Sequence, residues 1–169
     1  MYKFEKYKIC IIGLGYVGLP LALEFSKTFK VVGFDLSKSR INSLSKNIDN
    51  NFETSSNLIN KNIIFTDDVK RLIDCNIYII AVPTPIDKKN NPDISSLKKA
   101  SRLVGKLIKK NDIVVIESTV YPGCTRNDCI PLISQISKLT PNKDFYFGYS
   151  PERIKSRSSS QLSCSFVMS

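Results

Sequence analysis

A glycine-rich turn between an apolar run and a helical pattern constrains the fold of this chain more than any other feature. The turn consists of Gly13, Leu14, Gly15, Tyr16, Val17 and Gly18, and it follows a β-branched run at residues 7–12. In such a turn the first glycine permits tight bending, the second lets a ligand approach the backbone, and the third allows close packing of helix on strand. The helix expected at residues 16–28 would point its N-terminus at phosphate groups. The segment therefore predicts a strand, a phosphate-binding turn and a helix.

The same alternation of apolar runs and helix-period segments continues through the chain. It predicts strands at residues 7–12, 30–34, 62–66, 76–82, 112–117 and 144–149. It predicts helices at residues 16–28, 38–46, 94–110 and 125–139, with a short one up to residue 74 that Asp67 and Asp68 cap. This order is typical of an α/β fold with a Rossmann-type, doubly wound parallel sheet of about six strands. Ligand-binding residues are then expected directly after the strands.

A carboxylate stands where a dinucleotide site requires one. Asp35 closes the second predicted strand, twenty residues beyond Gly15, where it can accept hydrogen bonds from both hydroxyls of an adenosine ribose. Because Asp35 would repel a 2′-phosphate, we expect NAD rather than NADP, although Lys38 and Arg40 nearby leave dual use open. Asp35 could also be the N-cap of the helix at residues 38–46, and both roles can hold together.

Residues after two further strands would stand at the same edge of the sheet. Val82, Pro83 and Thr84 follow the strand at residues 76–82, and the prolines of this turn leave the Thr84 hydroxyl available to a ligand. A rigid turn without a ligand is the alternative. Ser118 and Thr119 follow the strand at residues 112–117, where they can contact a ligand or cap a helix.

A carboxylate and a guanidinium follow the sixth predicted strand. Glu152 could act as a base if it is partly desolvated, and Arg153 stands next to it. A glutamate beside an arginine is, however, more often an exposed ion pair than a catalyst. The residues alone leave both interpretations open.

The composition narrows the chemistry further. The 169 residues include no histidine, which excludes an imidazole base, and the five cysteines form no Cys-x-x-Cys pair, so we expect no metal. The net charge of +10 is spread along the chain and favours anions without selecting one class. No apolar stretch is long enough to span a bilayer. We therefore expect a soluble, cytoplasmic protein without a membrane or nucleic-acid partner.

Four motifs at strand ends together resemble the N-terminal domain of the UDP-glucose/GDP-mannose dehydrogenase family. The motifs are Gly13-Leu14-Gly15-Tyr16-Val17-Gly18-Leu19-Pro20, Val82-Pro83-Thr84-Pro85, Glu117-Ser118-Thr119-Val120 and Ser150-Pro151-Glu152-Arg153. The resemblance covers residues 7–154. The variants Pro-Thr-Pro-Ile-Asp, Ser-Thr-Val-Tyr-Pro-Gly and Pro-Glu-Arg-Ile look most like the branch that oxidises UDP-N-acetylated hexosamines, such as UDP-N-acetylgalactosamine or UDP-N-acetylmannosamine.

This resemblance implies a cofactor, a substrate and roles for residues. NAD would contact the glycine turn from Gly13 to Gly18, Asp35, Arg40, Val82, Pro83, Thr84, Ser118 and Thr119. Thr119 would also order a water, and Glu152 would assist thioester hydrolysis and contact the substrate together with Arg153. Members of the family are homo-oligomers that oxidise the C6 alcohol of a UDP-sugar to a carboxylate with two NAD, through an aldehyde and a cysteine-bound thioester. Their products are precursors of surface polysaccharides.

The sequence departs from the family pattern after residue 154. In the family, the nucleophilic cysteine, a lysine and an asparagine that stabilise the oxyanion, a central helix and a UDP-sugar-binding domain all follow this point. Residues 155–169 are instead rich in serine, without a helical or alternating period. One adenine inserted into codons for the family's Asn-Pro-Gly would give Lys155-Ser156-Arg157, so we interpret residues 155–169 as an out-of-frame tail. A natural truncation is the alternative.

We therefore expect residues 1–154 to form an NAD-binding domain that is inactive alone. A second hypothesis is an NAD-responsive binding or regulatory module without catalysis, which would use the positive charge on a partner. A third is a small self-sufficient dehydrogenase, for which Glu152 is the evident proton-transfer residue.

Overall fold

The structure, a computed structural model, describes residues 6–49, 61–85, 92–118 and 120–150. The strands are β1 (Lys8–Ile12), β2 (Lys30–Phe34), β3 (Ile63–Thr66), β4 (Ile77–Ile80), β5 (Ile113–Ile116) and β6 (Tyr146–Tyr149). The α-helices are α1 (Gly18–Ser26), α2 (Lys38–Ser45), α3 (Ser95–Leu107) and α4 (Ile130–Ser137). A 3-10 helix, η2 (Val69–Leu72), and a π-helical turn, η3 (Thr125–Cys129), complete the described elements.

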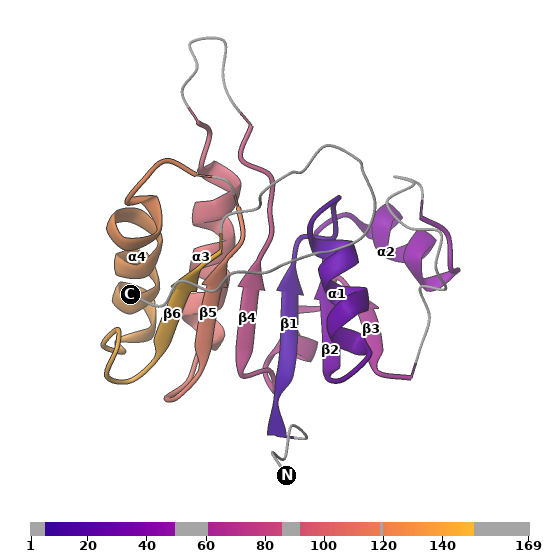
Figure 1. The fold of residues 1–169 in the computed structure, drawn as a ribbon, viewed down its shortest axis with the longest axis horizontal. Helices are drawn as coiled ribbons and strands as arrows, with labels where there is room; N and C mark the ends of the chain where they lie inside the picture. The colour runs from indigo at the N-terminus through magenta and orange to yellow at the C-terminus, as the bar shows by residue number, and fades with distance from the viewer. Residues whose placement is uncertain (1–5, 50–60, 86–91, 119, 151–169) are drawn as a thin grey trace.

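The six strands form one parallel sheet in the order β3-β2-β1-β4-β5-β6 (Figure 1). The predicted doubly wound sheet is therefore confirmed. The strand order reverses between β1 and β4, which lie side by side at the centre of the sheet. In a sheet of this kind the crevice at the carboxyl ends of these two strands is where ligands bind.

Each face of the sheet has its own core because side chains alternate along each strand. Cys10 and Ile12 of β1 pack with residues of α3 and α4, whereas Ile9 and Ile11 pack with residues of α1 and α2. Figure 1 shows α1 in front of the sheet and α3 behind it. Both layers hold β1 and β4 rigidly in place, so the loops that follow these strands start from fixed positions.

The strand ends are aligned along one edge. The register sets Ile12 opposite Phe34 and Ile80, so β1, β2 and β4 end together. Hydrogen bonding continues one residue beyond five of the strands: the amides of Gly13, Asp35, Ala81, Glu117 and Ser150 donate to carbonyls of the neighbouring strands at 2.8 to 3.2 Å. The segments that the sequence analysis predicts as candidate sites therefore leave the sheet side by side.

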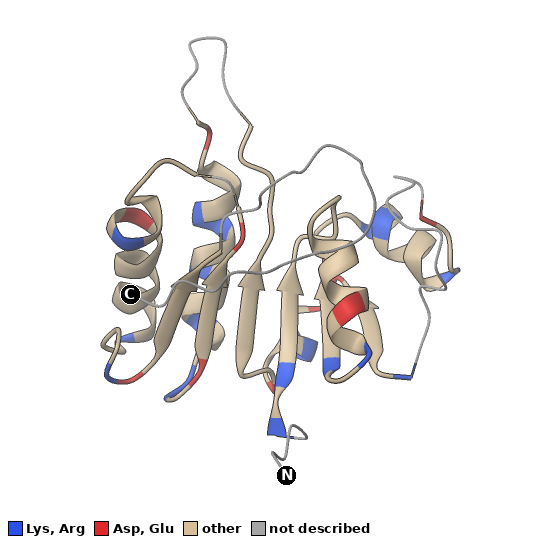
Figure 2. Ribbon diagram, in the orientation of Figure 1, with Lys and Arg blue, Asp and Glu red and all other residues tan. Residues whose placement is uncertain are grey.

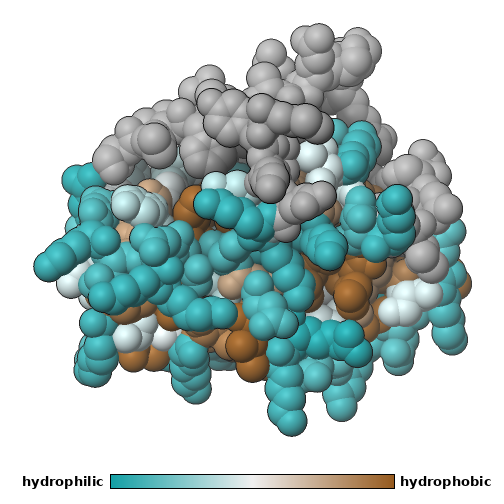
Figure 3. All heavy atoms as spheres, turned by 90° about the horizontal axis from the view of Figure 1, so that it is seen from below, coloured by the Kyte–Doolittle hydropathy of each residue, from teal (hydrophilic) through white to brown (hydrophobic). Residues whose placement is uncertain are grey.

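Basic residues are spread over the described part of the chain. Figure 2 shows lysines and arginines on several helices and at the amino ends of strands, with no single basic patch. Figure 3 views the side of the molecule that carries the amino ends of the strands, where hydrophilic groups cover most of the described surface. No helix in the described ranges is long and apolar enough to cross a membrane.

Three local predictions need correction. The short helix before residue 74 is the 3-10 helix η2, which Asp68 caps as predicted by accepting a hydrogen bond from the Lys70 amide. The helix predicted at residues 125–139 is divided into η3 and α4, and Pro131, which has no N–H to donate, stands at the start of α4. The N-cap of α2 is Ser37, whose hydroxyl accepts from an amide in the first turn, and not Asp35.

Candidate functional site

Two glycines of the turn after β1 are required by the fold itself. Gly13 has a φ of +95°, and a Cβ at this position would lie 2.7 Å from the Ala81 carbonyl oxygen. A Cβ at Gly18 would lie 1.8 Å from the Gly13 carbonyl oxygen. Both positions are therefore closed to larger residues by the backbone around them.

Gly15 differs from its two neighbours in the motif. Apart from its two chain neighbours, no atom of the described residues lies within 4 Å of a Cβ built on Gly15, and Gly15 is not among the residues with positive φ. Neither packing nor backbone strain explains a glycine here. The open space beside Gly15 is what the close approach of a pyrophosphate requires.

The helix that follows the turn presents an uncapped N-terminus. Its N-cap is Val17, which has no side-chain cap, and the first turn of α1 carries no acidic residue. The first N–H groups of a helix and its dipole favour an anion. Within the described part of the chain no side chain supplies that anion, so this end of α1 suits a phosphate.

Asp35 and Arg40 both hold the backbone of Leu14 in the turn. The Leu14 amide donates to Asp35 Oδ2 at 2.9 Å, and Arg40 Nε donates to the Leu14 carbonyl oxygen at 2.9 Å. The other carboxylate oxygen, Asp35 Oδ1, accepts from the Ser37 amide at 2.9 Å. A carboxylate offers about four acceptor positions. Asp35 is therefore fixed in orientation and can still accept hydrogen bonds from two ribose hydroxyls.

Arg40 is itself part of a buried ion pair. Its Nη1 lies 2.7 Å from Asp49 Oδ1, and the two side chains are 9% and 3% exposed. Arg40 Nη2 is buried and has no hydrogen-bond partner among the described residues. No motif in the sequence marks Asp49, because its contact with Arg40 forms only when the chain folds.

The loops after β4 and β5 are joined to each other. Ser118 is buried, and its hydroxyl donates to the Val82 carbonyl oxygen at 2.6 Å. The alternative that Ser118 caps a helix is wrong, because the N-cap of η3 is Cys124. Val82 and Thr84 are half-buried and Pro83 is exposed. These residues stand at the carboxyl edge, on the β4 side of the glycine turn.

The remaining predicted site residues cannot be placed in the site. Thr119, Glu152 and Arg153, together with the serine-rich tail at residues 155–169, lie outside the described residues. In the described ranges no group of three or more Cys, Asp or Glu side chains gathers in a way that could hold a metal ion.

A network not foreseen from the sequence anchors the loop that follows β5. The Tyr121 hydroxyl donates to one carboxylate oxygen of Asp128, and Lys98 Nζ of α3 lies 3.4 Å from the other. The hydrogen bond raises the pKa of Tyr121 and lowers the pKa of Asp128. This network ties the loop to η3 and α3.

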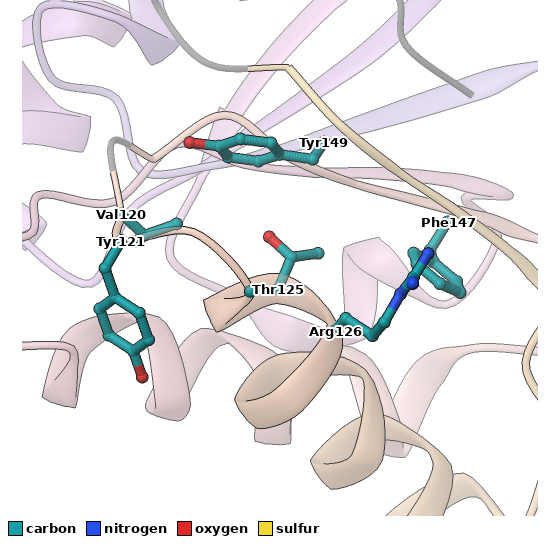
Figure 4. Close-up of a pocket in the computed structure, with 7 residues that line it drawn as sticks. Val120, Tyr121, Thr125, Arg126, Phe147 and Tyr149 are labelled. Atoms are coloured by element: carbon teal, nitrogen blue, oxygen red, sulfur yellow. The ribbon is translucent and has the colours of Figure 1, made fainter. Parts of the chain in front are cut away.

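A hollow beside this loop lies at the carboxyl end of β6. Its walls include Tyr121, Thr125, Arg126 and Tyr149. Thr125 is buried, its hydroxyl has no partner among the described residues, and Figure 4 shows the side chain pointing into the hollow. The hollow therefore offers a hydroxyl and a guanidinium beside the loop that begins at Ser118.

Comparison with known proteins agrees with this geometry. The model of the NAD binding domain of the UDP-glucose/GDP-mannose dehydrogenase family matches residues 7–161. A UDP-N-acetyl-D-glucosamine 6-dehydrogenase from Salmonella typhi is 51% identical over 156 residues, which are 91% of this chain and 37% of that protein. The protein CapL of Staphylococcus aureus is 52% identical over 147 residues, which are 86% of this chain and 35% of that protein.

Solved structures give the same answer. A UDP-D-ManNAc dehydrogenase from Pyrococcus horikoshii superimposes with a TM-score of 0.80 and 32% identity, over 88% of this chain and 37% of that one. A GDP-mannose dehydrogenase from Pseudomonas aeruginosa gives a TM-score of 0.79 and 29% identity, over 87% and 36%. The chain thus spans little more than a third of the length of the relatives it matches. It belongs to the UDP-glucose/GDP-mannose dehydrogenase family and corresponds to the NAD-binding domain of that family.

Proposed function

We propose that this chain binds NAD across the carboxyl ends of β2, β1 and β4, as the cofactor-binding part of a UDP-N-acetylhexosamine 6-dehydrogenase. Gly15 carries the proposal. The fold requires Gly13 and Gly18 for its own packing, whereas the space beside Gly15 is open. A glycine that no contact among the described residues requires, at the uncapped end of α1, is explained by a ligand that approaches the backbone.

In the proposed site, the parts of NAD lie at different positions along the edge of the sheet. The pyrophosphate lies over the glycine turn, and the amides at the start of α1 bind it. The adenosine ribose lies on the β2 side, where Asp35 accepts its hydroxyls and Arg40 supports the turn. The nicotinamide half lies on the other side of the reversal in strand order, near the residues that follow β4 and β5. These are Val82, Pro83, Thr84, Ser118 and Thr119.

The chemistry of the proposed reaction is divided between cofactor and protein. NAD, when bound, accepts a hydride from the alcohol carbon of the substrate. Thr119 and Glu152 are the proposed catalytic residues: Thr119 orders a water and Glu152 acts as a base toward it, while Glu152 and Arg153 contact the sugar nucleotide. The relatives include UDP-N-acetyl-D-glucosamine and UDP-N-acetyl-D-mannosamine dehydrogenases, which supports this substrate class.

The described cysteines do not suit the covalent half of such a reaction. Cys10, Cys75, Cys124 and Cys129 are all fully buried. Burial raises the pKa of Cys129 to about 12 and also raises the pKa of Cys124. A nucleophilic cysteine requires an accessible thiolate. We therefore propose that this chain binds NAD but does not oxidise a UDP-sugar alone.

Calorimetric titration of the purified chain with NAD tests the cofactor proposal. Saturable binding is expected, and the absence of binding at millimolar NAD would contradict it. Incubation with NAD and UDP-N-acetylglucosamine, followed by the absorbance of NADH, tests the second part. No NADH is expected, and sustained NADH formation that requires the UDP-sugar would show that the chain is a complete dehydrogenase.

A further inference from the structure

The buried ion pair of Arg40 and Asp49 lies next to the carboxylate that is proposed to bind the ribose. Asp35 and Arg40 contact the amide and the carbonyl of the same residue, Leu14, each at 2.9 Å. Arg40 is therefore the arginine placed at the position from which a dinucleotide site can reach a 2′-phosphate. Its position alone would favour NADP.

The charge of Arg40 is already balanced within the protein. Asp49 is 3% exposed and lies 2.7 Å from Arg40 Nη1. Because a buried charge is costly unless it is paired, each of the two residues compensates the charge of the other. A phosphate near Arg40 would meet the negative charges of both Asp49 and Asp35. The guanidinium can thus support the turn through its Nε without acting as a free cation.

We propose that Asp49 determines cofactor specificity by neutralising Arg40, and that it selects NAD against NADP together with Asp35. This inference rests on the proposed function, since it needs a dinucleotide at this edge. Nη2 of Arg40 is buried and has no partner among the described residues, so without the charge of Asp49 the guanidinium would be an uncompensated cation, whose positive charge favours a 2′-phosphate on the neighbouring ribose.

The Asp49→Asn variant separates charge from geometry. An asparagine has the same shape, and its carbonyl oxygen can still accept the hydrogen bond from Arg40 Nη1. We expect calorimetry to show that the variant binds NADP more tightly relative to NAD, by about threefold to tenfold, because the positive charge of Arg40 is then no longer balanced and favours the 2′-phosphate. A purely structural role would weaken both dinucleotides equally and leave their ratio unchanged.

Two further variants complete the design. Glu24→Gln removes an exposed carboxylate on α1 that lies beside Lys27, so it changes the net charge equally and should leave the ratio unchanged. The double variant Asp49→Asn with Arg40→Met should lose the gain in NADP binding, because the cation is absent. Thermal unfolding followed by circular dichroism confirms that each variant is folded before its affinities are compared.

The outcomes distinguish this inference from the function on which it rests. If the unsubstituted chain binds NAD and Asp49→Asn leaves the ratio of affinities unchanged, the specificity role of Asp49 is wrong and the function stands. If the unsubstituted chain binds neither dinucleotide, the proposed function fails and this inference fails with it. A gain for NADP that persists in the double variant would also overturn the role assigned to the pair.

Discussion

The hydroxyl of Ser118 donates a 2.6 Å hydrogen bond to the carbonyl oxygen of Val82, so the loops after β5 and β4 are joined at the carboxyl edge of the sheet. Both loops contain residues that we propose to lie beside the nicotinamide half of NAD. The bond fixes the distance between them before any ligand arrives.

Substitution of Ser118 by alanine should affect both stability and binding. It leaves the Val82 carbonyl without its donor, so we expect the free energy of unfolding to fall by about 1 kcal/mol. NAD affinity should fall as well. Ser134→Ala is the matched control, because Ser134 donates to the Leu139 carbonyl, also at 2.6 Å, far from the proposed site. Urea unfolding and calorimetry should show that the control loses stability alone; equal NAD affinity in both variants would contradict the proposed role.

The three glycines of the turn should respond differently to substitution. Gly15→Val adds a Cβ where no atom of the described part of the chain lies within 4 Å, chain neighbours aside, so we expect little change in the thermal midpoint and a loss of NAD binding. Gly18→Ala forces a Cβ against the Gly13 carbonyl, so it should destabilise the fold itself, by about 2 kcal/mol or more. Tight NAD binding by Gly15→Val would exclude the pyrophosphate from this position.

Asp35→Ala tests the ribose contact. The variant removes the acceptor of the Leu14 and Ser37 amides as well as the proposed acceptor of the ribose hydroxyls, so NAD affinity should fall about tenfold or more. Asp112→Ala is the control. It also removes a carboxylate that accepts a hydrogen bond from a backbone amide, that of Lys109, but Asp112 lies at the start of β5 and thus at the opposite edge of the sheet. Calorimetry on the two variants should show a loss of affinity in Asp35→Ala only.

Much of the fold could be predicted from the sequence because local and long-range signals agree. The apolar runs before Gly13 and Asp35 are strands, and each is followed by a helix with an apolar face, so only a parallel sheet buries both. Signals at the ends of helices were less certain. Asp35 and Ser37 are both good N-cap residues, and the sequence could not indicate that the Leu14 amide competes for the Asp35 carboxylate.

Only the residues of the candidate site that belong to sequence motifs could be predicted. Motifs mark residues whose backbone geometry or chemistry is local, as at Gly13 and Asp35. Asp49 and the pair of Tyr121 and Asp128 have no such pattern, because their partners come from contacts that form only when the chain folds. The motifs therefore mark the glycine turn that we propose to bind the cofactor, but not Asp49, which pairs with Arg40, or Asp128, which holds the loop after β5 through Tyr121.

Thiol reactivity should show that the described cysteines are inaccessible. Thiol–disulfide reagents react with thiolates, and Cys10, Cys75, Cys124 and Cys129 are buried, with the pKa of Cys129 raised by burial to about 12. In a Cys164→Ser background, Ellman's reagent at pH 8 should modify none of these four thiols in the native protein and all four in urea. Rapid modification of a native thiol would mean that a reactive cysteine exists in this domain.

The hydrogen bond from Tyr121 to Asp128 predicts how stability changes in acid. The bond lowers the pKa of Asp128 in the folded state below its value in the unfolded chain. Its contribution is therefore complete above the unfolded pKa, near 3.8, and is lost as the pH falls through the folded pKa. Tyr121→Phe should lower the thermal midpoint at pH 7 by about 2 °C, since such partly exposed contacts stabilise weakly.

The difference in thermal midpoint between Tyr121→Phe and the unsubstituted chain should shrink as the pH is lowered from 5 towards 2. Once Asp128 is protonated, its hydrogen bond with Tyr121 no longer involves a charged carboxylate and stabilises the unsubstituted chain less. Tyr146→Phe provides a control, because this substitution also removes a phenolic hydroxyl, from a residue on β6 that is 50% exposed. Thermal melts at several pH values measure both. A difference for Tyr121→Phe that stays constant down to pH 2 would show that the phenol stabilises the loop by packing and not through the carboxylate of Asp128.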